Sequence, residues 1–364
     1  MPKVSVVVPV YNVEDYLREC MDSLTRQTLQ DIEIICVNDG SKDRSPEILR
    51  EYAGKDSRII LIDQENSGYG KAMNTGMDTA TGEYLGIVEP DDYVALTMFE
   101  DLYQCAAEQN LDWVKADYCR FTTDQTQETR TFKHIHLSPD HEDYGKVFTP
   151  AEKKASFFFV MNTWAGIYRI SFLNEYGIRH HETPGASFQD NGFWFQTLLY
   201  ARRAMILDRP YYRVRRDNPN SSIRNPEKVY AINREYDYIR GILEKDPAVW
   251  QEMKEIYWRQ RIRNYGATLD RIADEYRAEY LETISHEMTD GLEKGEYDPE
   301  QFPEEDMELA KRLQRKEYTP PPALADEAEM LRNSRSYRIG RAITYLPGKV
   351  YRTIRGNPTT GGKR

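Results

Sequence analysis

The stretch Gly82-Glu83-Tyr84-Leu85-Gly86-Ile87-Val88-Glu89-Pro90-Asp91-Asp92 is the part of the sequence around which the rest of the chain is organised. Its first seven residues are an apolar run that predicts a buried strand, and three carboxylates follow where the strand ends in a turn. In an open α/β sheet, ligands bind beyond the carboxyl ends of the strands. Neighbouring carboxylates repel one another, and a hard divalent cation relieves that repulsion. The stretch therefore indicates either a cation site of the kind that bridges to phosphate, or only a turn rich in Asp and Pro.

Strands and helices alternate before this turn. Apolar, β-branched runs predict strands at residues 4–10, 32–37 and 58–62, and the acidic turn closes a fourth at 82–88. Residues 13–27 carry apolar side chains at helical spacing, Ser45-Pro46-Glu47 has the character of a helix start, and a short helix is expected through residues 74–80. This alternation predicts a doubly wound α/β fold with a mostly parallel sheet.

Polar side chains follow these strands at one edge of the predicted sheet. Asn12 follows the first strand and Asp39 ends the second, where its carboxylate could accept hydrogen bonds from a base or a ribose. Gly68 and Gly70 would let the backbone approach a ligand closely. Each feature alone is compatible with ordinary turn chemistry, but their joint placement favours a nucleotide site. The glycine spacing matches neither a dinucleotide fingerprint nor a P-loop.

Composition and charge restrict the class of protein. The 364 residues carry a net charge of −11, which argues against a nucleic-acid-binding protein as a whole. The four cysteines have no metal-type spacing and indicate free thiols in a reducing compartment. No stretch approaches a membrane span, and the first apolar run is too short for a signal peptide. We expect a cytoplasmic protein.

Four motifs in order resemble those of family-2 glycosyltransferases. They are Val-Val-Val-Pro-Val-Tyr-Asn at 6–12, Val-Asn-Asp-Gly-Ser-Lys-Asp at 37–43, the segment 66–76, and Glu-Pro-Asp-Asp at 89–92. The resemblance extends over roughly residues 3–225. It implies a GT-A fold, a nucleotide-diphosphate sugar as donor, most simply a UDP-sugar, and inversion at the anomeric carbon.

The resemblance also implies a role for each residue that matches a motif. Pro9, Tyr11 and Asn12 would line the base and ribose pocket, Asp39 would hold the base, Gly68 would lie near the nucleotide, and Asp91 would bind Mn²⁺ or Mg²⁺ on the diphosphate. Two positions depart from the pattern, since many members have Asp at Glu89 and Arg at Met73. Glu89 keeps the charge with a longer reach toward ribose or metal, and Lys71 is the candidate to replace the missing phosphate contact.

A second candidate centre lies at residues 187–195, Ser-Phe-Gln-Asp-Asn-Gly-Phe-Trp-Phe. Asp190 begins a predicted helix, so its side chain could be an N-cap, a role that Asp fills well. The family resemblance implies instead that Asp190 is the general base that deprotonates the acceptor hydroxyl. Many members have Glu where this chain has Gln189. An apolar surround would raise the pKa of the Asp190 carboxyl toward that of a more useful base.

Residues 111–225 are expected to form the acceptor half, after a donor half at 1–110. Trp164 could be a core residue or a surface for a sugar ring, and Asp92 is a second candidate on the acceptor side. Three arginines at 213, 215 and 216 are candidates for contact with the diphosphate, or equally a solvated strand face. The histidines at 134, 136 and 141 lie among polar residues, which favours an exposed strand or insertion loop over a metal site.

The remaining chain differs in composition. Residues 226–317 predict a small α-helical appendage to which we assign no chemistry, and residues 318–364 predict a linker followed by a basic tail. The tail has no acidic residue from Leu331 onward and interleaves apolar side chains with arginines and lysines. This pattern indicates contact with the anionic inner face of a membrane, a helix docked on the protein's own acidic surface, or a disordered end.

These observations predict a metal-dependent inverting glycosyltransferase that acts on a saccharide or lipid-linked saccharide during cell-surface polysaccharide synthesis. One alternative is a sugar-phosphate nucleotidyltransferase, which would show a Gly-rich loop with Arg or Lys directly after the first strand; Pro9-Val10-Tyr11-Asn12 is not such a loop. The other is an inactive nucleotide-sugar-binding module. Glu89, Met73 and Gln189 favour the inactive module, whereas Asp91 and Asp190 argue against it.

Overall fold

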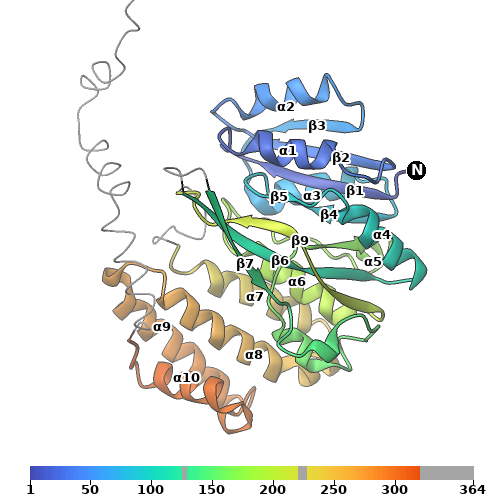
Figure 1. Ribbon diagram of the computed structural model, residues 1–364. Coiled ribbons are helices and arrows are strands. Elements are labelled where there is room, and N and C mark those ends of the chain that lie inside the picture. The colour runs from blue at the N-terminus through green and yellow to red at the C-terminus, as the bar shows by residue number, and fades with distance from the viewer. Residues whose placement is uncertain (125–128, 220–227, 320–364) are drawn as a thin grey trace, which may run out of the picture.

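The computed structural model describes residues 1–124, 129–219 and 228–319. Within these ranges nine strands form one sheet in the order β3-β2-β1-β4-β8-β6-β9-β5, with β7 paired to β6 (Figure 1). The strands are β1 (Val4–Val10), β2 (Ile32–Asp39), β3 (Ile59–Gln64), β4 (Tyr84–Ile87), β5 (Tyr93–Val94), β6 (Trp113–Asp124), β7 (Thr129–Ile135), β8 (Gly166–Arg169) and β9 (Ala204–Arg215). The first four pair in parallel, so their carboxyl ends share one edge.

The apolar runs of β1 and β2 are buried because helices cover both faces of this part of the sheet. Ile34 and Cys36 of β2 join the main core, where the Cys36 thiol contacts Met21 of α1 (Leu17–Thr25). Ile35 and Val37 of β2 point to the other face of the sheet and pack with Ala72 of α3 (Tyr69–Thr79). Successive side chains of a strand point to opposite faces, so an uninterrupted apolar run requires two covered faces.

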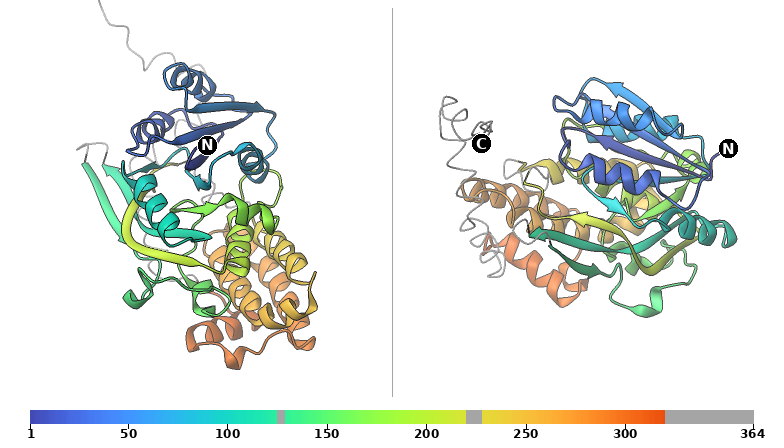
Figure 2. Two further views of the ribbon diagram at one scale, coloured as in Figure 1. Left: turned by 90° about the vertical axis from the view of Figure 1, so that its right-hand side faces the viewer. Right: turned by 45° about the horizontal axis from the view of Figure 1, so that its top comes forward.

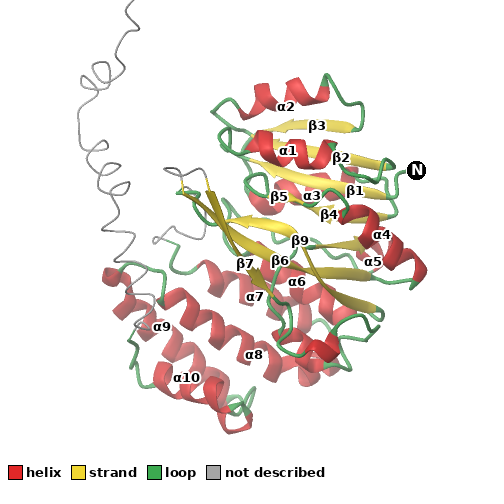
Figure 3. Ribbon diagram, in the orientation of Figure 1, coloured by secondary structure: helices red, strands yellow, loops and turns green. Residues whose placement is uncertain are grey.

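The second half of the sheet is mixed. Strand β8 runs antiparallel to β4 and to β6, whereas β6 and β9 run parallel (Figure 3). The β6–β9 ladder is irregular at one place: Ala116 pairs with Leu207 and Tyr118 pairs with Tyr212. Residues 208–211 of β9 therefore have only Asp117 opposite them, which makes an irregular bulge in β9.

Helices flank the sheet and then form the C-terminal part of the described chain. They are α2 (Ser45–Ala53), α4 (Met98–Glu108), α5 (Ile170–Glu175), α6 (Gln189–Tyr200), α7 (Ala231–Leu243), α8 (Pro247–Leu269), α9 (Asp274–Glu293) and α10 (Glu304–Gln314). Short 3-10 turns occur at His141–Asp143, Lys154–Phe158 and Pro299–Gln301. Helix α7 packs on α6 and α8, and the helices from α7 to α10 lie at the end of the molecule opposite β3 (Figure 2).

This architecture confirms the α/β prediction with a helical C-terminal region. The predicted parallel pairing holds for β1 to β4, while the strands after residue 110 supply antiparallel neighbours that the sequence did not indicate. The four cysteines are free thiols. No helix of the described ranges has the length and apolar character needed to cross a membrane. The basic tail and most of the predicted linker lie outside the described residues.

Candidate active site

The acidic turn lies just beyond β4, at the carboxyl edge shared by the first four strands. Glu89 is held from both sides: its backbone N–H donates to the Tyr212 hydroxyl at 2.9 Å, and its Oε1 accepts from the Tyr69 hydroxyl at 2.8 Å. Tyr69 is the first residue of α3 and Tyr212 belongs to β9. Glu89 is therefore fixed between the N-terminus of a helix and a strand from the second half of the sheet.

Strand β9 also holds the two aspartates of the turn. The Arg215 backbone N–H donates to Asp92 Oδ1 at 2.7 Å, and the Arg215 guanidinium donates from Nε to the Asp91 carbonyl at 2.9 Å. Asn218 Nδ2 donates to Asp91 Oδ2 at 2.8 Å. Asp92 is buried, so its carboxylate anchors β9, whereas Asp91 stays partly exposed.

The carboxyl groups of this site destabilise one another's charge. Burial raises the pKa of Glu89 to about 8, and the charges of Asp91 and Asp190 add to the rise although the Tyr69 hydrogen bond opposes it. Burial also raises the pKa of Asp91 despite the Asn218 hydrogen bond and the nearby Arg215. This set of oxygen donors fits a hard divalent cation, whose charge would remove the repulsion.

Asp190 reaches the site from α6. It is the second residue of that helix, and the residue in the cap position is Phe188, which has a positive φ of 66°. The N-cap interpretation of Asp190 is therefore wrong, because the helix begins one residue earlier than the sequence indicated. Burial raises the pKa of Asp190 to about 6, and the second largest cause is the carboxylate of Glu235 in α7.

Glu235 is itself held in place beside α6. Its Oε1 accepts from the Gly192 backbone N–H at 2.9 Å, and its Oε2 lies 2.9 Å from His181 Nδ1. A cavity of about 270 Å³ adjoins these groups, and its lining residues are His181, Thr183, Pro184, Ser187, Ala231, Arg234 and Glu235. This cavity is thus bounded on one side by α7, a helix to which the sequence assigned no chemistry.

Asp39 and Gly68 together shape the loop after β3. Asp39 Oδ1 accepts from Gln64 Nε2 at 2.8 Å and from the Ser67 N–H at 2.9 Å, and its Oδ2 accepts from the Gly68 N–H at 3.0 Å. Gly68 has φ +91°, and a Cβ there would lie 2.4 Å from the Thr183 carbonyl oxygen. The close backbone approach at Gly68 is therefore made to the chain's own 183–185 segment.

Asn12 has a comparable position after β1. It adopts a positive φ of 51°, its side-chain oxygen accepts from the Lys42 N–H at 2.7 Å, and its own N–H donates to Ser41 Oγ at 3.1 Å. Tyr11 is 48% exposed beside it, and Pro9 is buried in β1 opposite Val37. These contacts join the loops after β1 and β2 into one wall.

Comparison with known proteins agrees with this geometry. The family model for glycosyl transferase family 2 matches residues 5–172. A glycosyltransferase of Escherichia coli, YibD, is 32% identical over 252 residues, which cover 67% of this chain and 70% of that protein. The chain belongs to glycosyltransferase family 2.

The sequences of other relatives extend beyond the region that they share with this family-2 chain. EpsJ of Bacillus subtilis is 37% identical over 234 residues, and GlyA of Streptococcus pneumoniae is 30% identical over 270 residues. The chain spans 65% of EpsJ and 37% of GlyA. The crystal structure of TarS from S. aureus superposes with a TM-score of 0.59 at 19% identity, covering 86% of this chain and 53% of TarS. This likeness confirms the GT-A fold.

The structure brings some of the predicted site residues together and leaves others apart. The charges of Asp91 and of Asp190 both act on the Glu89 carboxyl and raise its pKa. Trp164 borders them, since its ring lies 4.3 Å from that of Tyr212, which holds Glu89. Lys71, in contrast, lies 3.4 Å from a carboxylate oxygen of Glu182. Ligand roles for all the predicted residues of this family-2 chain remain predictions.

Four further residues surround the site but did not stand out in the sequence: Tyr69, Tyr212, Asn218 and Glu235. Tyr69 lies between two glycines in a motif already singled out, so its position was a usable signal. Tyr212 and Asn218 follow from the pairing of β5 with β9, which brings β9 beside the acidic turn. Glu235 follows only from the packing of α7 on α6.

Proposed function

We propose that the chain transfers a sugar from a nucleotide-diphosphate donor to a hydroxyl of a saccharide or lipid-linked saccharide, with inversion at the anomeric carbon. One observation carries this proposal. The charge of Asp190, at the start of α6, acts on Glu89, just beyond the end of β4. Burial and repulsion raise the pKa of Glu89 to about 8, and burial and the Glu235 carboxylate raise the pKa of Asp190 to about 6. A cation-binding group and a base side by side are what glycosyl transfer to a hydroxyl requires.

Asp190 is the proposed general base. A carboxyl group with a pKa of about 6 is largely ionised at neutral pH, yet it accepts a proton more readily than an exposed aspartate. The acceptor oxygen would bond to C1 of the sugar as its proton passes to a carboxylate oxygen of Asp190. The bond between C1 and the diphosphate oxygen breaks with its electron pair on the leaving group, and attack from the opposite face inverts the centre.

Asp91, assisted by Glu89, is the proposed holder of Mn²⁺ or Mg²⁺. Such a cation, when bound, neutralises the negative charge that develops on the diphosphate. The side chain of Asp91 is partly exposed and fixed by Asn218, and Glu89 is fixed by Tyr69, so both are positioned before a ligand arrives. The wall formed by Asn12, Tyr11 and the Asp39-held loop is the proposed place for base and ribose.

A UDP-sugar is the donor class we favour. Structures of S. aureus TarS residues 1–349 with UDP and with UDP-GlcNAc superpose on this chain with TM-scores of 0.54 and 0.53. A related poly(ribitol-phosphate) beta-glucosyltransferase of Bacillus spizizenii is 29% identical over 296 residues. These neighbours support a role in the synthesis of a cell-surface polysaccharide. A cytoplasmic location with the basic tail at the inner membrane face is part of the same proposal.

The test measures nucleotide release from a panel of UDP-, dTDP- and GDP-sugars, with Mn²⁺, with Mg²⁺ and with EDTA. We expect slow hydrolysis of one donor that EDTA abolishes and that the Asp91→Asn variant loses. Glu108→Gln, which changes an exposed carboxylate at the end of α4, is the matched control and should keep the activity. Hydrolysis that is indifferent to EDTA and to Asp91→Asn would overturn the metal assignment.

The same panel separates the rival functions. A sugar-phosphate nucleotidyltransferase would release pyrophosphate from a nucleoside triphosphate and a sugar phosphate, and would leave the nucleotide-sugars intact. An inactive binding module would bind one nucleotide in a calorimetric titration without turning over any donor. Absence of nucleotide binding in the presence of either metal would refute the donor site itself.

A further inference from the structure

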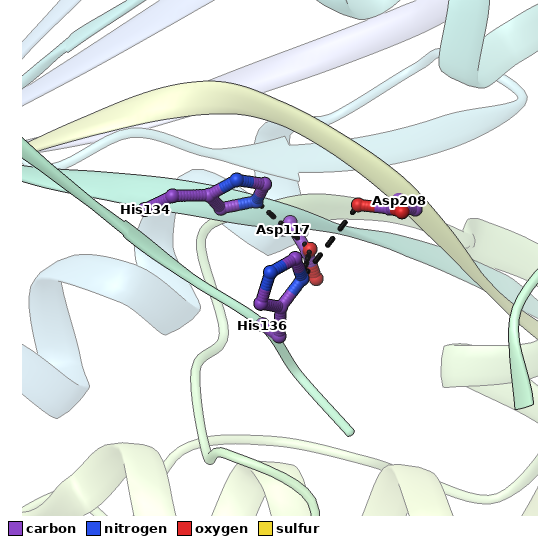
Figure 4. A group of neighbouring side chains, drawn as sticks. All are labelled: Asp117, His134, His136 and Asp208. Atoms are coloured by element: carbon purple, nitrogen blue, oxygen red, sulfur yellow. Dashed lines mark hydrogen bonds and ion pairs between the residues drawn. The ribbon is translucent and has the colours of Figure 1, made fainter. Parts of the chain in front are cut away.

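Two of the three histidines that the sequence analysis assigned to an exposed segment meet two carboxylates on the β6–β7–β9 part of the sheet (Figure 4). Within the described ranges, Asp117, His134, His136 and Asp208 form a group whose ligand atoms all lie within 4.8 Å of one another. His134 Nε2 lies 2.9 Å and His136 Nδ1 lies 2.6 Å from Asp117 Oδ2. His136 Nδ1 also lies 3.6 Å from Asp208 Oδ1.

Strand geometry explains why these side chains converge. His134 pairs with Cys119 across the β6–β7 ladder, and side chains two residues apart share one face of a strand. Asp117 and Cys119 therefore share a face of β6, and His134 of β7 and His136, which directly follows β7, lie on the same face of the sheet. Tyr118, the intervening residue, contacts Trp164, so the cluster lies on the opposite side of β6 from the acidic turn.

The bulge in β9 places the fourth side chain, that of Asp208, in the cluster. Asp208 is the first of the four residues of β9 that have only Asp117 opposite them. Bulges of this kind re-aim a side chain that a regular ladder would hold elsewhere. Here the bulge places the Asp208 carboxylate beside His136, and Figure 4 shows it pointing toward the imidazole.

Asp117 is oriented by groups that leave one oxygen for the cluster. Its Oδ1 accepts from the Leu137 backbone N–H at 2.9 Å and from the Tyr144 hydroxyl at 2.8 Å. Both imidazoles face the other oxygen. The aspartate is fully buried, whereas the His134 and His136 side chains are 36% and 42% exposed. A metal ligand held by outer hydrogen bonds, with an open side for access of an ion, has this arrangement.

Hydrogen bonds between the four residues account for only part of the geometry. They explain the contacts of the two imidazoles with Asp117. The 3.6 Å between His136 and Asp208 is too long for a hydrogen bond. It is close to the ~3.4 Å that separates two ligands of a tetrahedral ion bound at about 2.1 Å. With both imidazoles neutral, the two carboxylates would also balance the charge of a divalent ion.

We propose that Asp117, His134, His136 and Asp208 form a Zn²⁺ site, separate from the proposed donor site. Imidazole nitrogen and carboxylate oxygen are ligand types that Zn²⁺ accepts, and four protein ligands give the closed coordination of a structural site. Seating the ion would require the imidazoles to move from Asp117 by less than ~1 Å. The site would tie β7, whose residues are almost all exposed, to β6 and to the bulge of β9.

The test uses the full chain without a histidine tag, freed of metal with a chelator. Zn²⁺ is titrated by calorimetry, and bound metal is counted after desalting. We expect wild type to retain one equivalent of Zn²⁺ more than His134→Ala/His136→Ala and more than Asp208→Asn. His286→Ala, which removes an exposed histidine of α9, is the matched control and should retain the wild-type count. Asp91→Asn should also retain this equivalent, which separates the site from the donor carboxylates.

Three further measurements keep the result independent of folding. Co²⁺ in place of Zn²⁺ should give wild type the strong visible bands of a tetrahedral complex, and His134→Ala/His136→Ala should lack them. Zn²⁺ at a hundred times its Kd should shift the folding equilibrium of wild type about a hundred-fold and raise Tm by a few degrees. Far-ultraviolet circular dichroism identifies any variant that fails to fold, and Asp208→Asn, an exposed position, then decides. Equal zinc counts in wild type and Asp208→Asn, or a six-coordinate Co²⁺ spectrum, would overturn the proposal.

Discussion

Replacement of Glu89 by glutamine should stabilise the protein at high pH and leave its stability unchanged at low pH. The substitution keeps the shape of the side chain and an oxygen that can accept from the Tyr69 hydroxyl. It removes the charge that burial and the neighbours Asp91 and Asp190 make unfavourable. A residue whose charge is costly in the folded state and useful for ligand binding is expected at a functional site.

The size and sign of the effect follow from the shifted pKa of Glu89. Its ordinary value is 4.5, and the folded protein raises it to about 8. Below pH ~4.5 the side chain is protonated in both states and contributes no difference. As pH rises toward 8 the folded wild type holds a proton that the unfolded chain has lost, so its stability falls, and above 8 the loss is complete. Full conversion of the shift gives ~5 kcal/mol, and screening at a partly exposed group reduces the expected value to ~1–3 kcal/mol.

Urea unfolding of wild type and Glu89→Gln between pH 5 and pH 9, in EDTA, measures this difference. The free energy of unfolding of the variant should exceed that of wild type by an amount that grows with pH. Glu65→Gln, at an exposed carboxylate, should track wild type at every pH. A difference for Glu89→Gln that is the same at pH 5 and pH 9 would refute the assignment of an unfavourable charge to Glu89.

Three other substitutions address the base and the loop after β3. Asp190→Asn should lower kcat by ~10²–10⁴ while calorimetric binding of the nucleotide stays within about two-fold of wild type, and an equal loss of binding would argue against a base. Glu235→Gln should move the acidic limb of the kcat profile to lower pH, because the Glu235 carboxylate raises the pKa of Asp190; an unmoved limb would contradict that coupling. Gly68→Ala should lose ~1–3 kcal/mol more stability in urea than Gly145→Ala. Both glycines have positive φ, but only at Gly68 would a Cβ meet another atom within 4 Å, and equal losses would refute the packing argument.

The fold of residues 1–110, the predicted donor half, could be predicted because its signals are local. Runs such as 4–10 and 32–37 are apolar on both faces, and each ends in polar residues that the parallel pairing places at one edge. Asp39 ends β2 as predicted. Its hydrogen bonds to residues 64–68 were not foreseen, because they depend on the path of the chain after β3. The start of α6 was misplaced by one residue since a left-handed Phe188 is not a usual cap.

The chain after residue 110 was less accessible to sequence reasoning because its contacts join strands and helices that are distant in the sequence. Glu235 lies 45 positions after Asp190 in a segment that reads only as an amphipathic helix, and the pairing of α6 with α7 alone brings the two together. The His–Asp cluster depends on the β9 bulge, which no residue pattern announces. A histidine pair at alternate positions of a strand was visible, but Asp117 and Asp208 were not connected to it.

Strand β9 links the two candidate sites. One part of it carries Asp208 at the bulge, and its end carries Arg215, whose backbone N–H donates to the Asp92 carboxylate and whose Nε donates to the Asp91 carbonyl. The Arg215 guanidinium also pairs with Glu19 at 2.5 Å, and Glu19 pairs with Arg130 of β7 at 2.6 Å. Strand β7 is thus joined to the proposed donor site through Arg130, and to the proposed zinc site through His134 and the adjoining His136. Because β6 and β9 run side by side between these points, a change in the register of β7 would displace the residues of β9 that hold the acidic turn. A metal ion bound at the bulge would oppose such a change.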